Sequence, residues 1–237
     1  MKIERAPRNR KFVGDPRLWG VDLGTDYTFG MGTTTALITA GTAGQVLSEF
    51  GWTTTALAYV AGSAANFASS ATPGTAPHLL LGDASDLLAS PAVFGDYAHM
   101  LAASWVLGYF PTALVAEFRA AFTAFAANEP STAVGFVEDG GSVITGAAAD
   151  QLACISSNGT NFELNSGAAV DAGAAADASW HTFKIRVTSA NVEWFIDGTS
   201  QGTIALETAE FPVSFEAGVV AGGLNTIALG PPRVYYE

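Results

Sequence analysis

The sequence has little of three things: cysteine, long apolar runs and, over most of its length, positive charge. Its 237 residues include one cysteine, Cys154, so no intrachain disulfide can form. The longest uncharged apolar run, residues 100–116, is interrupted by glycine and proline and falls short of the ~20 residues that a membrane-spanning helix needs. We therefore expect this run to be buried core, and we expect no membrane partner. No apolar segment follows the charged start, so we also expect no secretory signal peptide.

Positive charge is concentrated at the start of the chain. The first 17 residues hold six basic and two acidic residues, which leaves a charge of +4. The remaining 220 residues hold four basic and twenty acidic residues, which leaves −16. A body this acidic repels phosphate groups and has too few cations for a basic groove, so nucleic-acid recognition by the body is excluded, and we expect no nucleic-acid partner.

Residues 1–35 differ from the rest of the chain. They combine basic residues with apolar ones and show no sustained helical or strand period. This mixture is typical of a segment that becomes ordered on a partner, although a flexible tail before a first strand is the alternative. We predict an extended basic N-terminal arm, residues 1–35, followed by one domain, residues 36–237. The partner contacts are predicted to come from Arg5, Arg8, Arg10, Lys11, Phe12, Arg17 and Trp19.

Short segments rich in Thr, Val, Ala and aromatic residues follow, separated by Gly, Pro, Ser and Asn. Many short strands with turn residues between them indicate an all-β sandwich or barrel. Residues 83–90 begin with a helix-capping pattern and allow a short helix, and the Ala- and Gly-rich residues 167–179 favour a loop. The strand candidates are residues 33–40, 51–61, 78–82, 104–110, 113–125, 132–138, 153–157 and 161–165.

Residues 181–204 give the strongest local pattern. Residues 181–187 place three apolar side chains on one face of a strand and polar ones on the other. Residues 192–197 alternate in the same way, and Asp197-Gly198 is a hairpin-turn signal because both residues accept positive φ. A third strand begins directly afterwards, so this stretch predicts a three-stranded antiparallel meander.

This meander resembles one in a known family. A Trp-His opening, an alternating strand, a short turn and a strand ending in Phe-Ile-Asp-Gly resemble the concanavalin A-like lectin/glucanase jelly roll, particularly its laminin-G-like branch. The resemblance extends over roughly residues 110–237 and favours a strand, rather than a helix, at residues 113–125. It implies two large antiparallel sheets packed face to face, with ligands often on the concave sheet. The residues that carry it are Trp180, His181, Phe183, Ile185, Val187, Val192, Trp194, Phe195, Ile196, Asp197 and Gly198.

The catalytic pattern of the family's glucanases, Glu-x-Asp-x-x-Glu, is absent from the sequence. Retaining hydrolysis needs two carboxyl groups about 5–5.5 Å apart. Glu193 and Asp197 share a strand face, but four residues separate them by roughly 13 Å. The three histidines, His78, His99 and His181, form no zinc-binding pattern. We therefore predict that the protein is not an enzyme.

Loop acids and aromatic residues are the remaining candidate ligand-binding groups. We predict no cofactor, with calcium left open at Glu138, Asp139, Asp171 or Asp177. Sugar binding needs aromatic platforms, which also serve as core residues, so we assign no carbohydrate-binding residue. The candidates are Trp52, Trp105, Trp180, Trp194, Tyr97 and Tyr109.

Laminin-G-like jelly rolls without signals or catalytic acids occur as bacteriophage virion components. The resemblance therefore implies a viral structural protein, capsid-decorating or head- or tail-associated, that is anchored by its arm and displays its jelly roll on the virion surface. Its partners would be major capsid or tail proteins and further copies of the same chain. The alternative is a carbohydrate-binding lectin module or host-surface adhesin that recognises cell-surface glycans.

Overall fold

The computed structural model describes part of the chain from residue 53 onward, and its named elements are all β-strands. No helix within this described part is long and apolar enough to cross a membrane. The predicted arm and the strand candidate at residues 33–40 lie outside it. The described residues are 53–55, 58–60, 78–81, 87–89, 94–95, 108, 110–122, 132–138, 141–143, 151–207, 211–219, 226–230 and 232–237.

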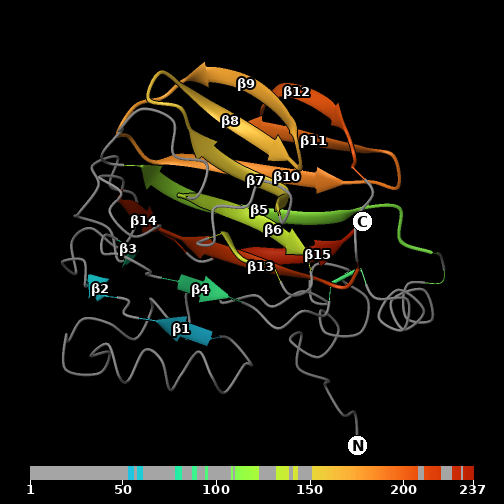
Figure 1. Cartoon of the computed structure of the whole chain (residues 1–237), viewed down its shortest axis with the longest axis horizontal. Helices are drawn as coiled ribbons and strands as arrows, with labels where there is room; N and C mark the ends of the chain where they lie inside the picture. Colours follow the sequence, from blue (N-terminus) through green and yellow to red (C-terminus); the bar gives the residue numbers. More distant parts are fainter. Residues whose placement is uncertain are drawn as a thin grey trace, which may run out of the picture.

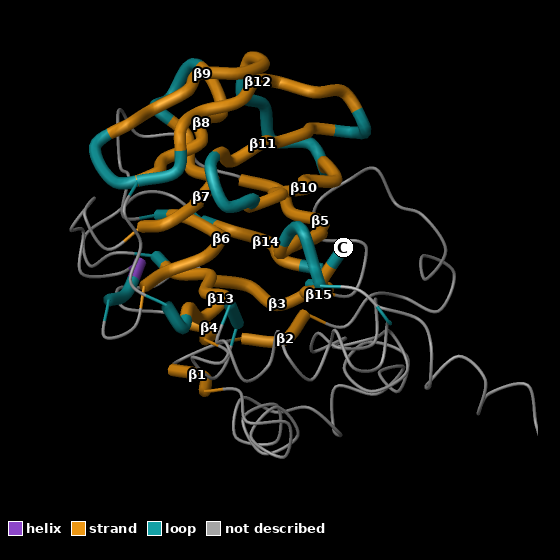
Figure 2. The backbone as a smooth tube through the Cα atoms, turned by 90° about the vertical axis from the view of Figure 1, so that its right-hand side faces the viewer, coloured by secondary structure: helices purple, strands orange, loops and turns teal. Residues whose placement is uncertain are grey.

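The strands form two antiparallel sheets that pack face to face, so the predicted all-β jelly-roll sandwich is confirmed (Figure 1). Figure 2 shows the seven-stranded sheet on the left and the eight-stranded sheet on the right. The first has the order β1 (Thr53–Thr55), β4 (Leu87–Ala89), β13 (Val213–Gly218), β6 (Ala133–Glu138), β7 (Gln151–Ser157), β8 (Asn161–Ser166), β9 (Ala169–Ala175). The second has the order β12 (Thr199–Ala205), β11 (Asn191–Ile196), β10 (His181–Val187), β5 (Leu114–Phe122), β14 (Ile227–Leu229), β3 (His78–Leu81), β2 (Ala58–Val60), and β15 (Arg233–Tyr236) also pairs with β5.

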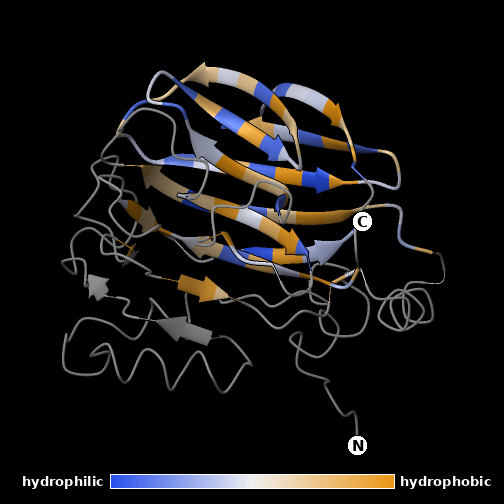
Figure 3. Ribbon diagram, viewed as in Figure 1, coloured by the Kyte–Doolittle hydropathy of each residue, from blue (hydrophilic) through white to orange (hydrophobic). Residues whose placement is uncertain are grey.

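The core lies between the sheets and is rich in aromatic side chains. Phe118 of β5 is stacked on Phe183 of β10 at 5.5 Å between ring centroids, and it meets Phe215 of β13 edge-on at 5.7 Å. Hydropathy alternates along β10 and β11, because every second side chain points into this core (Figure 3). The predicted strand at residues 113–125 is confirmed as β5, with Phe118 and Phe122 among its inward-facing residues.

The two sheets are linked along one edge through Trp194. This side chain is fully buried, and its indole N–H donates to Asp171 of β9, in the opposite sheet, at 2.8 Å. A Cβ on Gly173 would lie 2.5 Å from the indole ring, so glycine is needed there for the close approach. Strands β9 and β12 thereby lie against each other at the top of Figure 1, which protects both sheet edges.

The predicted meander is confirmed in detail. Strands β10, β11 and β12 follow each other as antiparallel neighbours. Asp197 and Gly198 form the second turn with φ angles of 49° and 79°, as the Asp-Gly pair predicts. Residues 158–160 likewise turn the chain between β7 and β8, where the Asn158 side chain accepts hydrogen bonds from the backbone of Thr160 and Asn161.

Two local predictions were wrong. Within residues 83–90, which allowed a helix, residues 87–89 form β4 because they pair with both β1 and β13. Within the predicted loop at residues 167–179, residues 169–175 form β9, which continues a hairpin from β8 through Gly167 at φ 54°. The strand predicted at residues 104–110 lies mostly outside the described residues. Only Gly108 and Phe110 are described and neither belongs to a strand, so the prediction for residues 104–107 stays untested.

Candidate functional site

Charged side chains gather on the outer face of the eight-stranded sheet, away from the core. Four residues line up across four strands at this face, Phe195 of β11, Lys184 of β10, Glu117 of β5 and Arg233 of β15. Their neighbours along each strand point inward, because side chains alternate between the two faces of a strand. The same alternation of side chains that directs apolar residues into the core therefore places these four residues on the outer face.

A groove of about 360 Å³ lies at this row, lined by Glu117, Thr182, Lys184, Phe195 and Gly198. The turn after β11 forms one side of it. There the Asp197 carboxylate accepts a hydrogen bond from the Thr182 backbone N–H at 2.8 Å, and the Asp197 N–H donates to the Thr182 carbonyl at 2.8 Å. These two bonds hold Thr182 and Gly198 in position beside the charged row.

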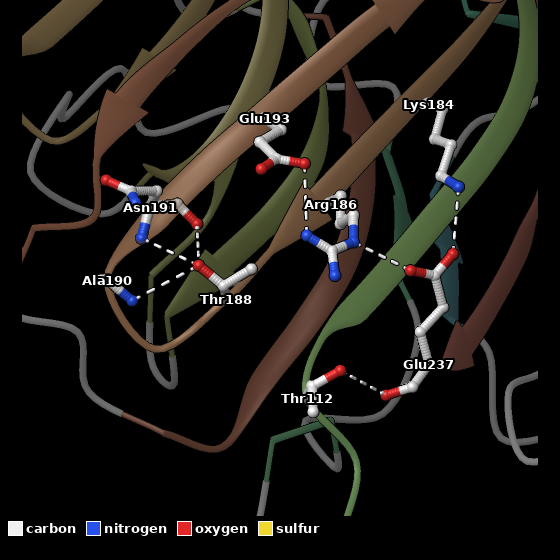
Figure 4. Close-up of polar contacts among 8 residues, drawn as sticks. All are labelled: Thr112, Lys184, Arg186, Thr188, Ala190, Asn191, Glu193 and Glu237. Carbon is white, nitrogen blue, oxygen red and sulfur yellow. Dashed lines mark hydrogen bonds and ion pairs between the residues drawn. The ribbon is translucent and has the colours of Figure 1, made fainter.

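Three charged residues continue from the groove as a ladder of ion pairs (Figure 4). Lys184 Nζ lies 3.0 Å from Glu237 Oε1, and Arg186 Nε lies 2.8 Å from Glu237 Oε2. Arg186 also reaches Glu193 at 3.2 Å. Burial opposes ionisation of Glu237, but the hydrogen bonds from Arg186 and Lys184 hold the pKa of its carboxyl below the usual range. The hydrogen bond to Glu237 likewise raises the pKa of Arg186.

The backbone of Glu237 is anchored as well. Its carbonyl accepts from the Thr112 N–H at 2.6 Å and from the Thr112 hydroxyl at 3.3 Å (Figure 4). Its own N–H donates to the Ala113 carbonyl at 2.9 Å. The carboxylate that organises Lys184 and Arg186 is therefore attached to a fixed main chain.

Glu117 is held from the opposite side by Tyr235. The Tyr235 hydroxyl donates to Glu117 Oε1 at 2.8 Å, and Lys184 Nζ lies 3.9 Å from the same oxygen. Burial, together with the neighbouring Glu117 carboxylate, raises the pKa of Tyr235. The Lys184 ammonium also lies 6.0 Å from the centre of the Phe195 ring. Donor, acceptor and ring thus keep set positions around the groove.

Every basic residue of the chain beyond residue 17 lies on this outer face. Lys184 and Arg186 come from β10, Arg119 from β5 and Arg233 from β15. The Arg119 guanidinium lies 5.2 Å from the centre of the Trp180 ring, a cation–π distance. Twenty acidic residues are spread over the same part of the chain, whereas its four Lys and Arg residues share this one face.

His181 lies next to the groove, between two carboxylates. Its Nδ1 is 2.7 Å from Asp197 and its Nε2 is 3.1 Å from Asp177. Burial opposes protonation, but the hydrogen bonds to Asp197 and Asp177 raise the pKa of the imidazole. Since Asp197 also holds Thr182, His181 supports one side of the groove, in line with the structural role that its position at a strand start suggests.

None of the aromatic residues that the sequence suggested for sugar binding lines the groove, as far as the structure describes them. Trp194 is in the core and Trp180 is 8% exposed, whereas Trp52, Trp105, Tyr97 and Tyr109 lie outside the described residues. The arm residues Arg5, Arg8, Arg10, Lys11, Phe12, Arg17 and Trp19 also lie outside them. Sequence reasoning missed Glu117, Lys184 and Phe195 as site residues. In the sequence, these residues could be recognised only as members of the polar faces of their alternating strands. That pattern does not show which strands lie next to each other in the sheet.

Two of the four acids considered for calcium have other contacts. Asp171 accepts from Trp194, and Asp177 accepts from His181 and from the Ser179 N–H. Glu138 ends β6, and Asp139 lies outside the described residues. Where the structure describes the chain, no three His, Cys, Asp or Glu side chains come together to hold a metal ion. Calcium binding stays an untested prediction.

No family model matches the chain, and no curated protein sequence is similar to it. Solved structures with a distant likeness include an alginate lyase from Corynebacterium sp. at 15% identity and TM-score 0.40, covering 53% of this chain and 59% of the lyase. Domain 4 of an extracellular arabinanase from Geobacillus stearothermophilus, solved with arabinotriose, has 12% identity, TM-score 0.44 and coverages of 77% and 76%. A Trypanosoma rangeli sialidase has 10% identity, TM-score 0.48 and coverages of 70% and 26%.

These likenesses are too distant to carry an argument about function. The chain also spans less than two thirds of the lyase and of the sialidase. They do correct one prediction, that the protein is not an enzyme. Lyases and sialidases are among the similar chains, so membership of this fold class cannot exclude catalysis, and that prediction is contradicted. Nothing in the comparisons points to a bacteriophage.

Proposed function

We propose that the protein is a carbohydrate-binding module and that its binding site is the groove lined by Glu117, Thr182, Lys184, Phe195 and Gly198. One observation carries this proposal. The four basic residues that the chain has beyond residue 17 all lie on the outer face around this groove, beside carboxylates and an aromatic ring.

The side chains in the groove suit a ligand rich in hydroxyl groups. Lys184 offers up to three donors, Glu117 offers acceptor oxygens and Thr182 offers a hydroxyl that does both. Phe195 adds an apolar ring against which the C–H face of a sugar can pack. A volume of about 360 Å³ lies within the range of small-molecule sites.

The charges on this face favour a neutral sugar over a polyanion. Lys184 and Arg186 already contact Glu237, and Arg186 also contacts Glu193. An anionic ligand would have to compete with these carboxylates and approach an acidic body, whereas sugar hydroxyls can bridge both signs of charge.

The ion pairs on this face contribute little to the stability of the fold. The paired side chains of Lys184, Arg186, Glu193 and Glu237 are 26–35% exposed. Ion pairs this close to solvent typically contribute about 0–1 kcal/mol each. A sheet that only needed a solvated outer face would not require all four of the Lys and Arg residues that the chain has beyond residue 17, and recognition of a polar ligand accounts for them better.

The test is a glycan microarray of neutral and acidic oligosaccharides, probed with the wild-type chain and three variants. We expect binding to neutral glycans that falls at least tenfold in Phe195→Ala and in Lys184→Met. Phe211→Ala is the matched control, because it removes an exposed ring outside the groove and should leave binding unchanged. Equal binding by all variants, or no binding by the wild type, contradicts the proposal. Glycans that bind are then incubated with the protein and analysed for cleavage, which tests catalysis directly.

The alternative of a virion component remains a prediction about other residues. It depends on the arm at residues 1–35, on the domain boundary after it and on assembly with capsid or tail proteins or with further copies of the chain. These residues lie outside the described part, and no comparison supports a virion role. The groove on the described residues therefore supports the lectin-like alternative.

A further inference from the structure

A second pocket, of about 530 Å³, lies at one end of the eight-stranded sheet. Among the described residues, none lines both this pocket and the groove. Leu114 at the start of β5, Val187 at the end of β10 and Tyr236 at the end of β15 come together there, since Leu114 pairs with both of the others. Leu206, which follows β12, and Phe211 complete the apolar walls.

The Phe211 ring is exposed yet held in place. It is 46% exposed and packs directly on Gly95, where a Cβ would lie 2.2 Å from a ring carbon. Gly95 has φ +74°, and its N–H donates to the Tyr236 hydroxyl at 3.1 Å. The preceding residue, Phe94, exchanges two backbone hydrogen bonds with Val213 at 3.1 and 2.8 Å. A ring fixed in this way is ready to pack against a ligand without a loss of its own freedom.

The chemistry of the pocket favours an uncharged ligand. Its described lining residues include no Asp, Glu, Lys, Arg or His. A charged group that enters such a site loses its hydration without gaining a partner, which is costly. Ser189 and Thr188 bring hydroxyl groups to the rim, where a single polar end of the ligand can stay hydrated.

The size of the feature favours a small molecule over a protein. About 530 Å³ lies within the usual range of ligand pockets. Among the described residues, only Phe110, Val170 and Phe211 are large apolar side chains with substantial exposure. Protein interfaces bury about 800 Å² on each partner around a core of such side chains, and three of them are too few to supply it.

We propose that this pocket binds a small, uncharged aromatic molecule of one to three rings, packed against Phe211 between Leu114, Val187 and Leu206. Any polar end of the ligand stays beside Thr188 and Ser189. This site is independent of the carbohydrate groove.

The experiment uses 1-naphthalenemethanol as the neutral probe and 1-naphthoate as its charged counterpart. Binding to the full chain is followed by saturation-transfer NMR across a concentration series. Ser189→Trp places an indole at the pocket, and Ala190→Trp places the same ring on the same turn but outside the lining. Ser189 and Ala190 are both exposed, so both variants should fold, which thermal unfolding checks.

We expect saturable binding of the alcohol, at least tenfold weaker binding of the carboxylate, and at least a tenfold loss of alcohol binding in Ser189→Trp but not in Ala190→Trp. If Ser189→Trp unfolds, Ser189→Phe replaces it. The proposal is overturned if the alcohol does not bind saturably, if both probes bind equally, or if the two tryptophan variants bind alike.

Discussion

Replacing Glu237 by glutamine separates a ligand-binding role of the ion-pair ladder from a stabilising one. The carboxylate contacts Lys184 at 3.0 Å and Arg186 at 2.8 Å, with partner side chains that are 29% and 26% exposed. Pairs of this exposure contribute about 0.2–1 kcal/mol each. Glutamine keeps the shape and one acceptor, so we expect the free energy of unfolding to fall by about 0.5–2 kcal/mol, which lowers Tm by about 1–8 °C for a chain of this size.

The same substitution should weaken glycan binding more than its effect on stability suggests. Without the carboxylate, Lys184 loses its charged partner at 3.0 Å and is held less firmly at the groove. Loss of one well-placed hydrogen bond from a charged group to the glycan costs about 1.5–3 kcal/mol, or at least tenfold in Kd. Urea unfolding followed by tryptophan fluorescence measures stability, and titration with a glycan from the array measures binding.

Phe118→Ala is the reference variant for the loss of stability that follows from damage to the core. This ring is buried between Phe183 and Phe215, and its removal should cost about 3–5 kcal/mol. If Glu237→Gln costs as much as Phe118→Ala and leaves glycan binding unchanged, the ladder is part of the scaffold and the reasoning is refuted.

Two further predictions concern the fold and its pH dependence. In Gly135→Ala the new Cβ would lie 2.0 Å from the Ala153 carbonyl oxygen of the adjacent strand, so unfolding in urea should show a loss of about 3 kcal/mol; a loss below 1 kcal/mol would mean that the strands can move apart. The pKa of His181 is raised in the fold above its unfolded value of about 6.5, so its stabilisation is complete below that pH and is lost as pH rises through the folded pKa. Wild type should therefore lose more stability than His181→Gln between pH 5.5 and 8.5, and parallel pH profiles for the two proteins would contradict the role of Asp177 and Asp197.

Local patterns predicted the part of the fold that consists of hairpins. In the meander, alternation assigned the inward and outward side chains, and Asp197-Gly198 marked its turn, because both signals depend only on neighbouring residues. The same reasoning failed at β9, whose alanines and glycines show no alternation, and at β4, which is a strand because of its two neighbours in the sheet. In both places, backbone pairing with another strand outweighed the local preference.

The candidate site was beyond such patterns. Its row joins β11 and β10, which are consecutive, to β5 and β15, which are far from them in sequence. The alternating pattern assigned Lys184 and Phe195 to the polar faces of their strands. It could not show that Glu117 lies beside Lys184, or that Glu237 reaches both Lys184 and Arg186.

The sequence by itself determined that the chain forms antiparallel strands without disulfides, where the strongest meander turns, and that cations are scarce outside the first 17 residues. These properties follow from composition and from side chains a few residues apart. Only the tertiary structure decided that cations from the three strands β5, β10 and β15 share one outer face, that Trp194 connects the two sheets and that Phe211 forms a pocket wall against Gly95. Such contacts depend on which strands pair across the whole chain, and that pairing is settled when all the inward faces are buried together.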